Sequence, residues 1–379
     1  MHVTVVKETA ERERRVALTP VGVEKLTAAG HTVTAETGCG RSAGFTDEAY
    51  SAAGATVTDR DAALASGGVV VGIHAVRTGI GPDHVVVGLV DPIWRPAAAD
   101  RLAETGATVL SLELMPRITR AQSMDVLSSM ATVAGYEAVL LAATRLPKMF
   151  PLLMTAAGTV PAARTVVLGA GVAGLQAIAT ARRLGSVVEA YDVRPAAAEQ
   201  IESVGGKSIR LDLDTAESED VGGYARAQSD DTNLRQQELL APYIADADIV
   251  ITTAAIPGAR SPELVTTAMV DPMRPGSVIV DLAAERGGNC SLTRADDEVV
   301  HNGVTVLGPT DLASRSATSA SRMYSNNVVT YLTHLTGDNG ELVLDVDDEI
   351  TAGTLVARGG SVVHPNVIDA IARSNRGSE

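Results

Sequence analysis

Cysteine is scarce in this sequence. The 379 residues include two cysteines, Cys39 and Cys290, which lie far apart beside glycines and lack the spacing of a metal-binding pair. So few cysteines exclude a disulfide-based scaffold and favour a reducing, cytoplasmic location. We therefore expect neither disulfide bonds nor a metal site.

Aromatic side chains are also few. They make up 3% of the sequence, whereas hydrophobic residues together make up 45%. The hydrophobic cores must therefore consist of Ala, Val, Leu and Ile, which is typical of helices packed on parallel strands. Because 379 residues exceed the length of one ordinary domain, we predict an α/β protein with two domains.

Basic residues and long apolar runs are under-represented as well. The chain has 31 Lys and Arg against 46 Asp and Glu, a net charge of −15. This charge opposes binding to nucleic acid or to an anionic membrane surface, although it is also a common solubility feature. No uninterrupted run of about 18 apolar residues occurs, so we expect no direct membrane insertion and favour a small-molecule or protein partner.

Short Val-rich runs alternate with helical patterns in the first third of the chain. Strands are predicted at 3–6, 31–36, 69–73, 85–90 and 108–112, and a helix is predicted at 20–29. The alternation indicates βαβ units and a largely parallel sheet. No glycine fingerprint follows the first strand, so we do not expect this part to bind a dinucleotide.

A second alternating series follows a predicted connecting helix at 122–145. Its strands are predicted at 165–168, 187–191, 248–251 and 278–280. A helix at 320–335 should then return the chain to the first domain, and the tail after it, rich in strand residues that include 342–344, should finish that domain. The predicted architecture is two Rossmann-like, doubly wound parallel-sheet domains joined by long helices. The first comprises 1–130 and 320–379, the second comprises 140–317, and the cleft between them is the default site for chemistry.

The strand at 165–168 leads into a glycine pattern typical of dinucleotide-binding turns. The six residues of the pattern are Gly169, Ala170, Gly171, Val172, Ala173 and Gly174. The first glycine permits a tight turn, the second lets the backbone approach a pyrophosphate, and the third permits close packing of helix on strand. The N-terminus of the following helix offers free N–H groups to the phosphates. We assign all six residues to cofactor binding.

Asp192 ends the next predicted strand, about 20 residues further on, where a carboxylate can accept hydrogen bonds from the ribose hydroxyls. A carboxylate here would repel a 2′-phosphate, so the sequence favours NAD(H) over NADP(H). Arg194 could accommodate that phosphate, but we interpret it as flanking the adenine. Val193, Thr253 and Ala254 complete the predicted cofactor-binding residues.

Four further segments resemble the NAD(H)-binding domain I of proton-translocating NAD(P) transhydrogenase, a family related to alanine dehydrogenase. They are 14–20 (RRVALTP), 115–125 (MPRITRAQSMD), 155–161 (TAAGTVP) and 278–290 (VIVDLAAERGGNC). The resemblance covers nearly the whole chain, and the loop at 117–125 is specific to the transhydrogenase branch.

The resemblance implies that the chain binds NAD(H) and passes hydride to or from NADP(H) on a separate domain III, while a membrane subunit translocates protons. It places Arg117, Gln122 and Asp125 around the nicotinamide, with Ser128 and Tyr136 nearby. These residues also have structural interpretations. Arg117 and Asp125 could form only a surface ion pair, Gln122 and Ser128 could cap the connecting helix, and Tyr136 could be a core aromatic.

The resemblance further implies a homodimer and a mobile loop, containing Tyr224, that closes over the nucleotide. The apolar side chains of Met124, Met130 and Val133 on the connecting helix are expected to offer surface to the second copy. Such a subunit would be cytoplasmic, and peripheral to the inner membrane through its partner subunits.

Hydride transfer between two nicotinamides needs no general acid or base, because the cofactors carry the reaction and the protein positions them. An amino-acid dehydrogenase must instead bind a carboxylate and move protons. The lysine that alanine dehydrogenase would place near 71–76 is absent, and His74 and Arg77 stand there instead. The alternatives are a stand-alone NAD-dependent amino- or imino-acid dehydrogenase, with Arg15 binding the substrate carboxylate, and a non-catalytic NAD-binding regulatory module.

Overall fold

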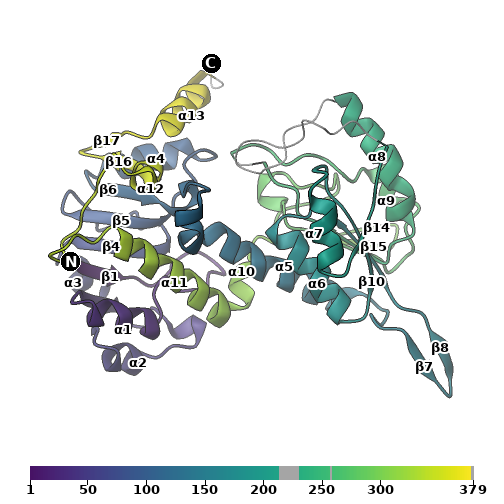
Figure 1. Ribbon diagram of the computed structural model, residues 1–379, viewed down its shortest axis with the longest axis horizontal. Helices are drawn as coiled ribbons and strands as arrows, with labels where there is room; N and C mark the ends of the chain where they lie inside the picture. The colour runs from purple at the N-terminus through teal and green to yellow at the C-terminus, as the bar shows by residue number, and fades with distance from the viewer. Residues whose placement is uncertain (213–229, 257, 377–379) are drawn as a thin grey trace. The chain divides into compact units, whose positions relative to one another are not determined.

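The computed structural model describes residues 1–212, 230–256 and 258–376 (Figure 1). The chain divides into two compact units, Met1–Met130 with Ala313–Glu379, and Ala131–Leu312. Each unit is built on its own parallel-dominated sheet with helices packed against it, as in a Rossmann-like fold. The predicted α/β fold class is confirmed.

The first unit contains an eight-stranded sheet in the order β17-β16-β6-β5-β4-β1-β2-β3. Its strands are β1 (His2–Val5), β2 (Thr32–Glu36), β3 (Thr56–Thr58), β4 (Gly68–His74), β5 (His84–Leu89), β6 (Thr108–Ser111), β16 (Leu355–Arg358) and β17 (Ser361–Val362). The strands from β3 to β6 are parallel, and β16 and β17 add an antiparallel edge. The strand order reverses between β1 and β4, which is where α/β sheets usually bind ligands.

The helices of the first unit come from both parts of the chain. They are α1 (Pro20–Ala28), α2 (Asp47–Ala52), α3 (Arg60–Leu64), α4 (Pro96–Ala103), α11 (Ala317–His334), α12 (Glu349–Thr354) and α13 (Pro365–Arg376), with short 3-10 helices η1 (Arg41–Ala43), η2 (Leu112–Leu114) and η3 (Thr119–Met124). Helix α1 begins at Pro20 behind the capping hydroxyl of Thr19. It packs so closely on α11 that a Cβ added at Gly22 would lie 2.3 Å from the Ser325 hydroxyl.

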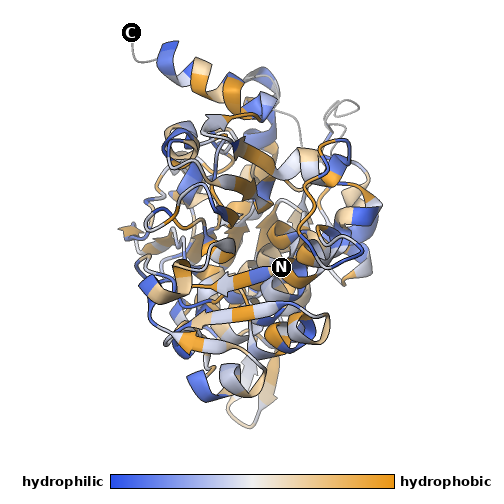
Figure 2. Ribbon diagram, turned by 90° about the vertical axis from the view of Figure 1, so that its left-hand side faces the viewer, coloured by the Kyte–Doolittle hydropathy of each residue, from blue (hydrophilic) through white to orange (hydrophobic). Residues whose placement is uncertain are grey.

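The C-terminal helix α13 is amphipathic. Hydrophobic and hydrophilic residues alternate along it (Figure 2), and Val367 and Ala370 are its buried residues. It packs on α4, and Val367 joins the hydrophobic cluster that contains residues of the neighbouring strands β6 and β16. The C-terminal part of the chain therefore completes the first sheet and its covering layer.

The second unit contains a seven-stranded sheet in the order β11-β10-β9-β12-β13-β15-β14. Its strands are β9 (Arg164–Leu168), β10 (Val187–Tyr191), β11 (Lys207–Ser208), β12 (Ile249–Thr252), β13 (Val278–Asp281), β14 (Glu298–His301) and β15 (Val304–Leu307). All neighbours are parallel except β14 and β15. Residues of β9, β12 and β13 feed a hydrophobic cluster on each face of the sheet, as expected for strands buried on both sides.

A separate hairpin and several helices complete the second unit. The hairpin consists of β7 (Leu153–Thr155) and β8 (Gly158–Val160) and extends away from the sheet of this unit (Figure 1). The helices are α6 (Val172–Arg183), α7 (Ala197–Ser203), α8 (Asp230–Ala245), α9 (Thr267–Val270) and the 3-10 helix η4 (Ala284–Arg286). Helices α5 (Val126–Arg145) and α10 (Leu312–Arg315) each contain residues of both units.

Helix α5 differs from the predicted connecting helix at its start. The predicted helix at 122–145 begins only at Val126, because residues 119–124 form η3 and Asp125 caps the helix. Among the described residues, α5 is the one helix that is long and apolar enough to cross a membrane by length and composition. Its Ala138, Val139 and Ala142 side chains lie in the core of the second unit, which explains the apolar composition.

Two expectations from the sequence are wrong. Residues 342–344 do not form a strand: Leu342 makes only an isolated bridge to Thr336, and the strands of the C-terminal tail are β16 and β17. Met124, Met130 and Val133 do not offer surface to a second copy, because all three are buried within the chain, with exposed fractions of 6%, 8% and 6%.

Candidate nucleotide-binding site

The turn between β9 and α6 has the geometry that its first glycine was predicted to provide. Gly169 has φ +97°, a left-handed conformation that a side chain would strain. A Cβ at this position would also lie 2.6 Å from the hydroxyl of Thr253, which donates a hydrogen bond to the Gly169 carbonyl at 3.0 Å. The turn is therefore tied to the end of β12.

The other two glycines of the fingerprint serve different purposes. A Cβ at Gly174 would lie 1.9 Å from the Gly169 carbonyl oxygen, so this glycine permits the close approach of helix and strand. Nothing lies within 4 Å of the Cβ position of Gly171, and this residue caps α6 without a side-chain hydrogen bond. The first turn of α6 therefore has open space and uncapped N–H groups where a pyrophosphate could approach.

Gly135 on α5 supports this turn, although it belongs to no motif that the sequence displays. A Cβ at Gly135 would lie 2.1 Å from the backbone carbonyl oxygen of Ala173, in the first turn of α6. The backbones of α5 and α6 thus meet at the phosphate-binding end of α6. A glycine inside an apolar helix lowers the stability of that helix, so its presence at position 135 was the feature of the sequence that pointed to a close packing contact.

Asp192 follows β10 and lies against the glycine turn. Its carboxylate accepts a hydrogen bond from the Ala170 N–H at 2.7 Å and two from the Arg194 guanidinium, at 2.9 and 3.1 Å. The side chains are 7% and 18% exposed, so the pair is largely buried. The ribose hydroxyls of a nucleotide would have to share this carboxylate with Arg194, and Val193 lies between the two residues.

Ala254 is held by a network that the sequence did not predict. The Asn289 side chain accepts a hydrogen bond from the Ala254 N–H at 3.0 Å and donates one to the Ala254 carbonyl at 2.9 Å. Asp281, at the end of β13, accepts hydrogen bonds from the N–H of Asn289 at 2.7 Å and from the Thr293 hydroxyl at 2.6 Å. Both Asn289 and Asp281 are fully buried. The signal in the sequence was the place of Asp281 at the end of a buried strand, with Asn289 further along the same 278–290 segment.

The second unit therefore brings the predicted cofactor-binding residues together at the carboxyl ends of β9, β10 and β12. Among the described residues, no three His, Cys, Asp or Glu side chains form a group that could hold a metal ion.

The loop at 117–125 belongs to the first unit. Arg117 and Gln122 are exposed, and the Gln122 side chain makes no hydrogen bond to any described residue. Asp125 accepts hydrogen bonds from the N–H and the hydroxyl of Ser128, at 2.9 and 2.6 Å, so its carboxylate caps α5. The cap is therefore Asp125 and neither Gln122 nor Ser128: Ser128 lies in the first turn as the donor, and the Gln122 side chain is available for another contact.

The structure tests the prediction for one of the two tyrosines expected near the nucleotide. Tyr136 is 40% exposed on α5, which contradicts its interpretation as a core aromatic. Tyr224 lies outside the described residues, so its predicted place in a loop over the nucleotide stays a prediction.

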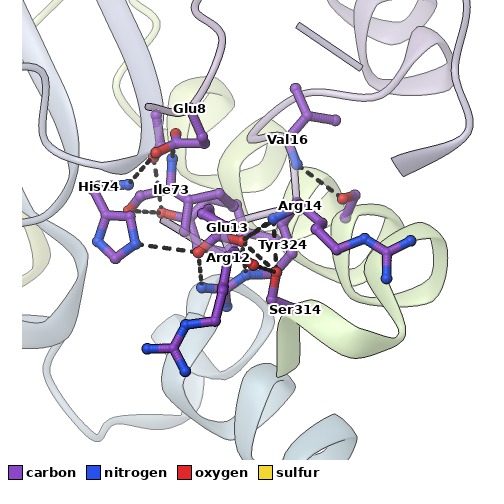
Figure 3. A network of polar contacts seen from close by, with 12 residues as sticks. Glu8, Arg12, Glu13, Arg14, Val16, Ile73, His74, Ser314 and Tyr324 are labelled. Carbon is purple, nitrogen blue, oxygen red and sulfur yellow. Dashed lines mark hydrogen bonds and ion pairs between the residues drawn. The ribbon is translucent and has the colours of Figure 1, made fainter. Parts of the chain in front are cut away.

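A polar cluster lies in the first unit, where the strand order reverses between β1 and β4 (Figure 3). The Glu13 carboxylate accepts hydrogen bonds from Nε and Nη2 of Arg15, at 2.7 and 2.5 Å, and lies 3.1 Å from Nε2 of His74. Burial alone would raise the pKa of Glu13, but the hydrogen bonds from Arg15 and His74 outweigh it and hold this pKa below its ordinary value. The same contact with Glu13 raises the pKa of His74.

Glu8 is the second carboxylate of the cluster. It accepts hydrogen bonds from the N–H of Ile73 at 2.6 Å and of His74 at 3.4 Å, and burial raises its pKa to about 7. Arg15 directs its guanidinium at Glu13, and their side chains are 10% and 4% exposed. The residue proposed to bind a substrate carboxylate in the dehydrogenase alternative is thus already paired with a carboxylate of the chain itself.

Comparison with known proteins extends over both units. Residues 4–134 match the alanine dehydrogenase/PNT N-terminal domain, and residues 138–365 match the alanine dehydrogenase/PNT C-terminal domain. The chain is 45% identical to the first part of NAD(P) transhydrogenase subunit alpha from Rhodospirillum rubrum, over 96% of this chain and 98% of that protein. A transhydrogenase structure from Sinorhizobium meliloti superposes with a TM-score of 0.84 at 43% identity, covering 96% of this chain and 99% of the other. An L-alanine dehydrogenase structure superposes with a TM-score of 0.82 at 26% identity, covering 98% and 99%.

Proposed function

We propose that this chain, which belongs to the alanine dehydrogenase/PNT family, is the NAD(H)-binding subunit of an NAD(P) transhydrogenase. In this role it passes hydride between NADH and NADP⁺ held by a partner subunit, and a membrane subunit couples the transfer to proton translocation. The observation that carries the proposal is the nearly full-length similarity to the first part of a transhydrogenase subunit alpha. The geometry of the second unit supports the NAD(H)-binding half of it.

The residues of the second unit fit an NAD(H) molecule. The open space at Gly171 and the N-terminus of α6 suit the pyrophosphate, and the buried carboxylate of Asp192 suits the ribose hydroxyls. Because Arg194 is paired with that carboxylate, a 2′-phosphate would meet a neutralised guanidinium beside an acidic group. This arrangement supports NAD(H) over NADP(H) for this chain.

The bound NAD(H) supplies the hydride chemistry, and the chain supplies position. In this proposal the exposed amide of Gln122 and the side chain of Arg117 orient the nicotinamide. Asp125 holds the end of their loop to the start of α5 through Ser128. None of these roles requires a proton transfer.

The dehydrogenase alternative receives no support from the polar cluster of the first unit. Its substrate carboxylate would have to displace Glu13 from Arg15, leaving the buried Glu13 carboxylate without its two guanidinium hydrogen bonds. No observation favours the regulatory alternative.

A homodimer is also part of the proposal, and the β7–β8 hairpin supports it. Met154 in this hairpin is 80% exposed and Leu152 just before it is 56% exposed. Large apolar side chains exposed together on a projecting hairpin are typical of a protein interface. The dimer would be peripheral to the membrane, held there by its partner subunits.

The proposal is tested by mixing the purified chain, NADH and a transhydrogenase domain III that carries an NADP⁺ analogue, and following hydride transfer by stopped flow. We expect transfer only when both proteins are present. Controls omit either protein, and a parallel reaction offers an imino or keto acid without domain III. Oxidation of NADH by that acid, without transfer to domain III, would overturn the proposal in favour of the dehydrogenase.

A further inference from the structure

Asn327 is a buried amide on α11, followed directly by two valines. It is 8% exposed, and its neighbours Val328 and Val329 are buried as well. Its Nδ2 donates a hydrogen bond to the backbone carbonyl of Ser123 at 2.8 Å, while its buried Oδ1 has no partner among the described residues. Burying an amide with an unsatisfied acceptor is unfavourable, so an apolar residue would suit the packing better. What this asparagine adds is its hydrogen bond to Ser123.

Ser123 directly follows Gln122 in η3. The flanking residues Ala121 and Met124 are buried, with 1% and 6% of their surface exposed. Arg120 adds an ion pair to Asp348 at 3.2 Å, but its side chain is 62% exposed and this contact holds the loop weakly. The partly buried hydrogen bond from Asn327, whose own side chain is 8% exposed, is thus a more sheltered polar anchor of the segment that carries Gln122 than the Arg120 ion pair.

We propose that Asn327 is a positioning residue for hydride transfer. By holding the Ser123 carbonyl, it fixes the direction in which the adjacent Gln122 presents its exposed amide to the nicotinamide. Asn327 acts through the loop and contacts neither the cofactor nor the reacting atoms. The inference rests on the proposed function, because it assigns the loop the task of orienting a nicotinamide.

Two substitutions separate this role from a merely structural one. Asn327→Leu removes the anchor and the unsatisfied acceptor while keeping a side chain of four heavy atoms branched at Cγ, and Asn327→Asp places an acceptor opposite the Ser123 carbonyl. The matched control is Asn326→Leu on the same helix, because Asn326 is exposed and bonds Nζ of Lys25 at 2.9 Å instead of the loop. The measurements are single-turnover hydride transfer to domain III at saturating NADH, NADH affinity, thermal unfolding, and amide hydrogen exchange across residues 119–125.

We expect both Asn327 variants to transfer hydride at least tenfold more slowly, with NADH affinity changed by less than about twofold. Amide exchange in the loop should rise in both, while Asn327→Leu should unfold at or above the wild-type temperature and Asn326→Leu should match the wild type throughout. Wild-type transfer rates in Asn327→Leu, or a rate loss that only follows lost stability or lost NADH affinity, would overturn the inference. If the wild-type chain itself transfers no hydride to domain III, the proposed function fails, and the inference that rests on it fails too.

Discussion

Asp192 and Arg194 form a bidentate salt bridge at the edge of the glycine turn. Nε and Nη2 of Arg194 lie 2.9 and 3.1 Å from the two carboxylate oxygens. The same carboxylate accepts a hydrogen bond from Ala170 inside the turn. One side chain therefore connects the predicted phosphate-binding and ribose-binding parts of the site. It also neutralises the arginine that could otherwise attract a 2′-phosphate.

This pair predicts the cofactor preference. NADH should bind at least tenfold more tightly than NADPH, a difference of about 1.4 kcal/mol. Asp192→Ala should weaken NADH binding by tenfold or more, because it removes the ribose acceptor. It should also reduce the preference for NADH over NADPH, because it releases Arg194. Calorimetric titration with both nucleotides measures this, with Glu202→Gln in an exposed ion pair as the control. Equal wild-type affinities for the two nucleotides would contradict the prediction.

The loop at 117–125 should affect the rate of hydride transfer more than cofactor binding. Gln122→Asn shortens the exposed amide, and Asp125→Asn keeps an acceptor for capping α5 while removing the charge. Each change should slow transfer to domain III by tenfold or more, about 1.4 kcal/mol, with NADH affinity largely intact. Stopped-flow measurement at saturating NADH tests this. Unchanged rates in both variants would remove the loop from the mechanism.

Gly135 on α5 and Gly171 at the start of α6 predict separable losses of NADH binding and of stability. Gly135→Ala should displace α6, because the new Cβ would lie 2.1 Å from the Ala173 carbonyl oxygen, so it should weaken NADH binding and lower the free energy of unfolding by roughly 1–3 kcal/mol. Gly171→Ala fills open space, so it should weaken NADH binding with little change in stability. Gly81→Ala, also in open space but in the first unit, is the control.

Calorimetry and denaturant unfolding on the three glycine variants provide the comparison. Full NADH affinity in Gly171→Ala would show that the pyrophosphate does not approach this glycine.

The exposed hairpin predicts the oligomeric state. The chain should be a dimer at micromolar concentration, and Met154→Asp should shift it toward the monomer, because a charge would then replace an 80% exposed apolar side chain at the interface. Light scattering gives the mass of each. Val300→Asp is the control, since Val300 is 64% exposed on β14, outside the hairpin. A wild-type monomer, or a dimer unaffected by Met154→Asp, would rule out this interface.

Glu8 predicts a dependence of stability on pH. The folded chain keeps the Glu8 proton up to about pH 7, whereas the ordinary pKa is 4.5. Between these values the folded state binds more protons than the unfolded state, so this group lowers the free energy of unfolding as pH rises. Glu8→Gln removes this pH dependence. The free energy of unfolding of the variant minus that of the wild type should therefore rise by roughly 1–3 kcal/mol between pH 4.5 and a pH above 7.

Denaturant unfolding at several pH values measures the Glu8 effect, with the exposed Glu24→Gln as the control. A constant difference between Glu8→Gln and the wild type across this range would show that Glu8 titrates normally.

Local patterns in the sequence were enough to predict the class of fold and much of the cofactor site. The apolar run at Val187–Tyr191 predicted the bounds of β10, and the glycine pattern predicted the turn at Gly169, because both depend on neighbouring residues and on backbone conformation. The alternation of such runs predicted parallel sheets, since parallel strands require a crossover between them.

Only the tertiary structure could identify the contacts between distant parts of the chain. Asn327 and Ser123 are 204 positions apart, and Gly135 meets Ala173 because two helix backbones approach each other. The same holds for the edge of the first sheet, where β16 pairs with β6 and residues 342–344 do not become a strand. Each of these outcomes depends on where the folded backbone brings a partner, and no local periodicity or turn residue carries that information.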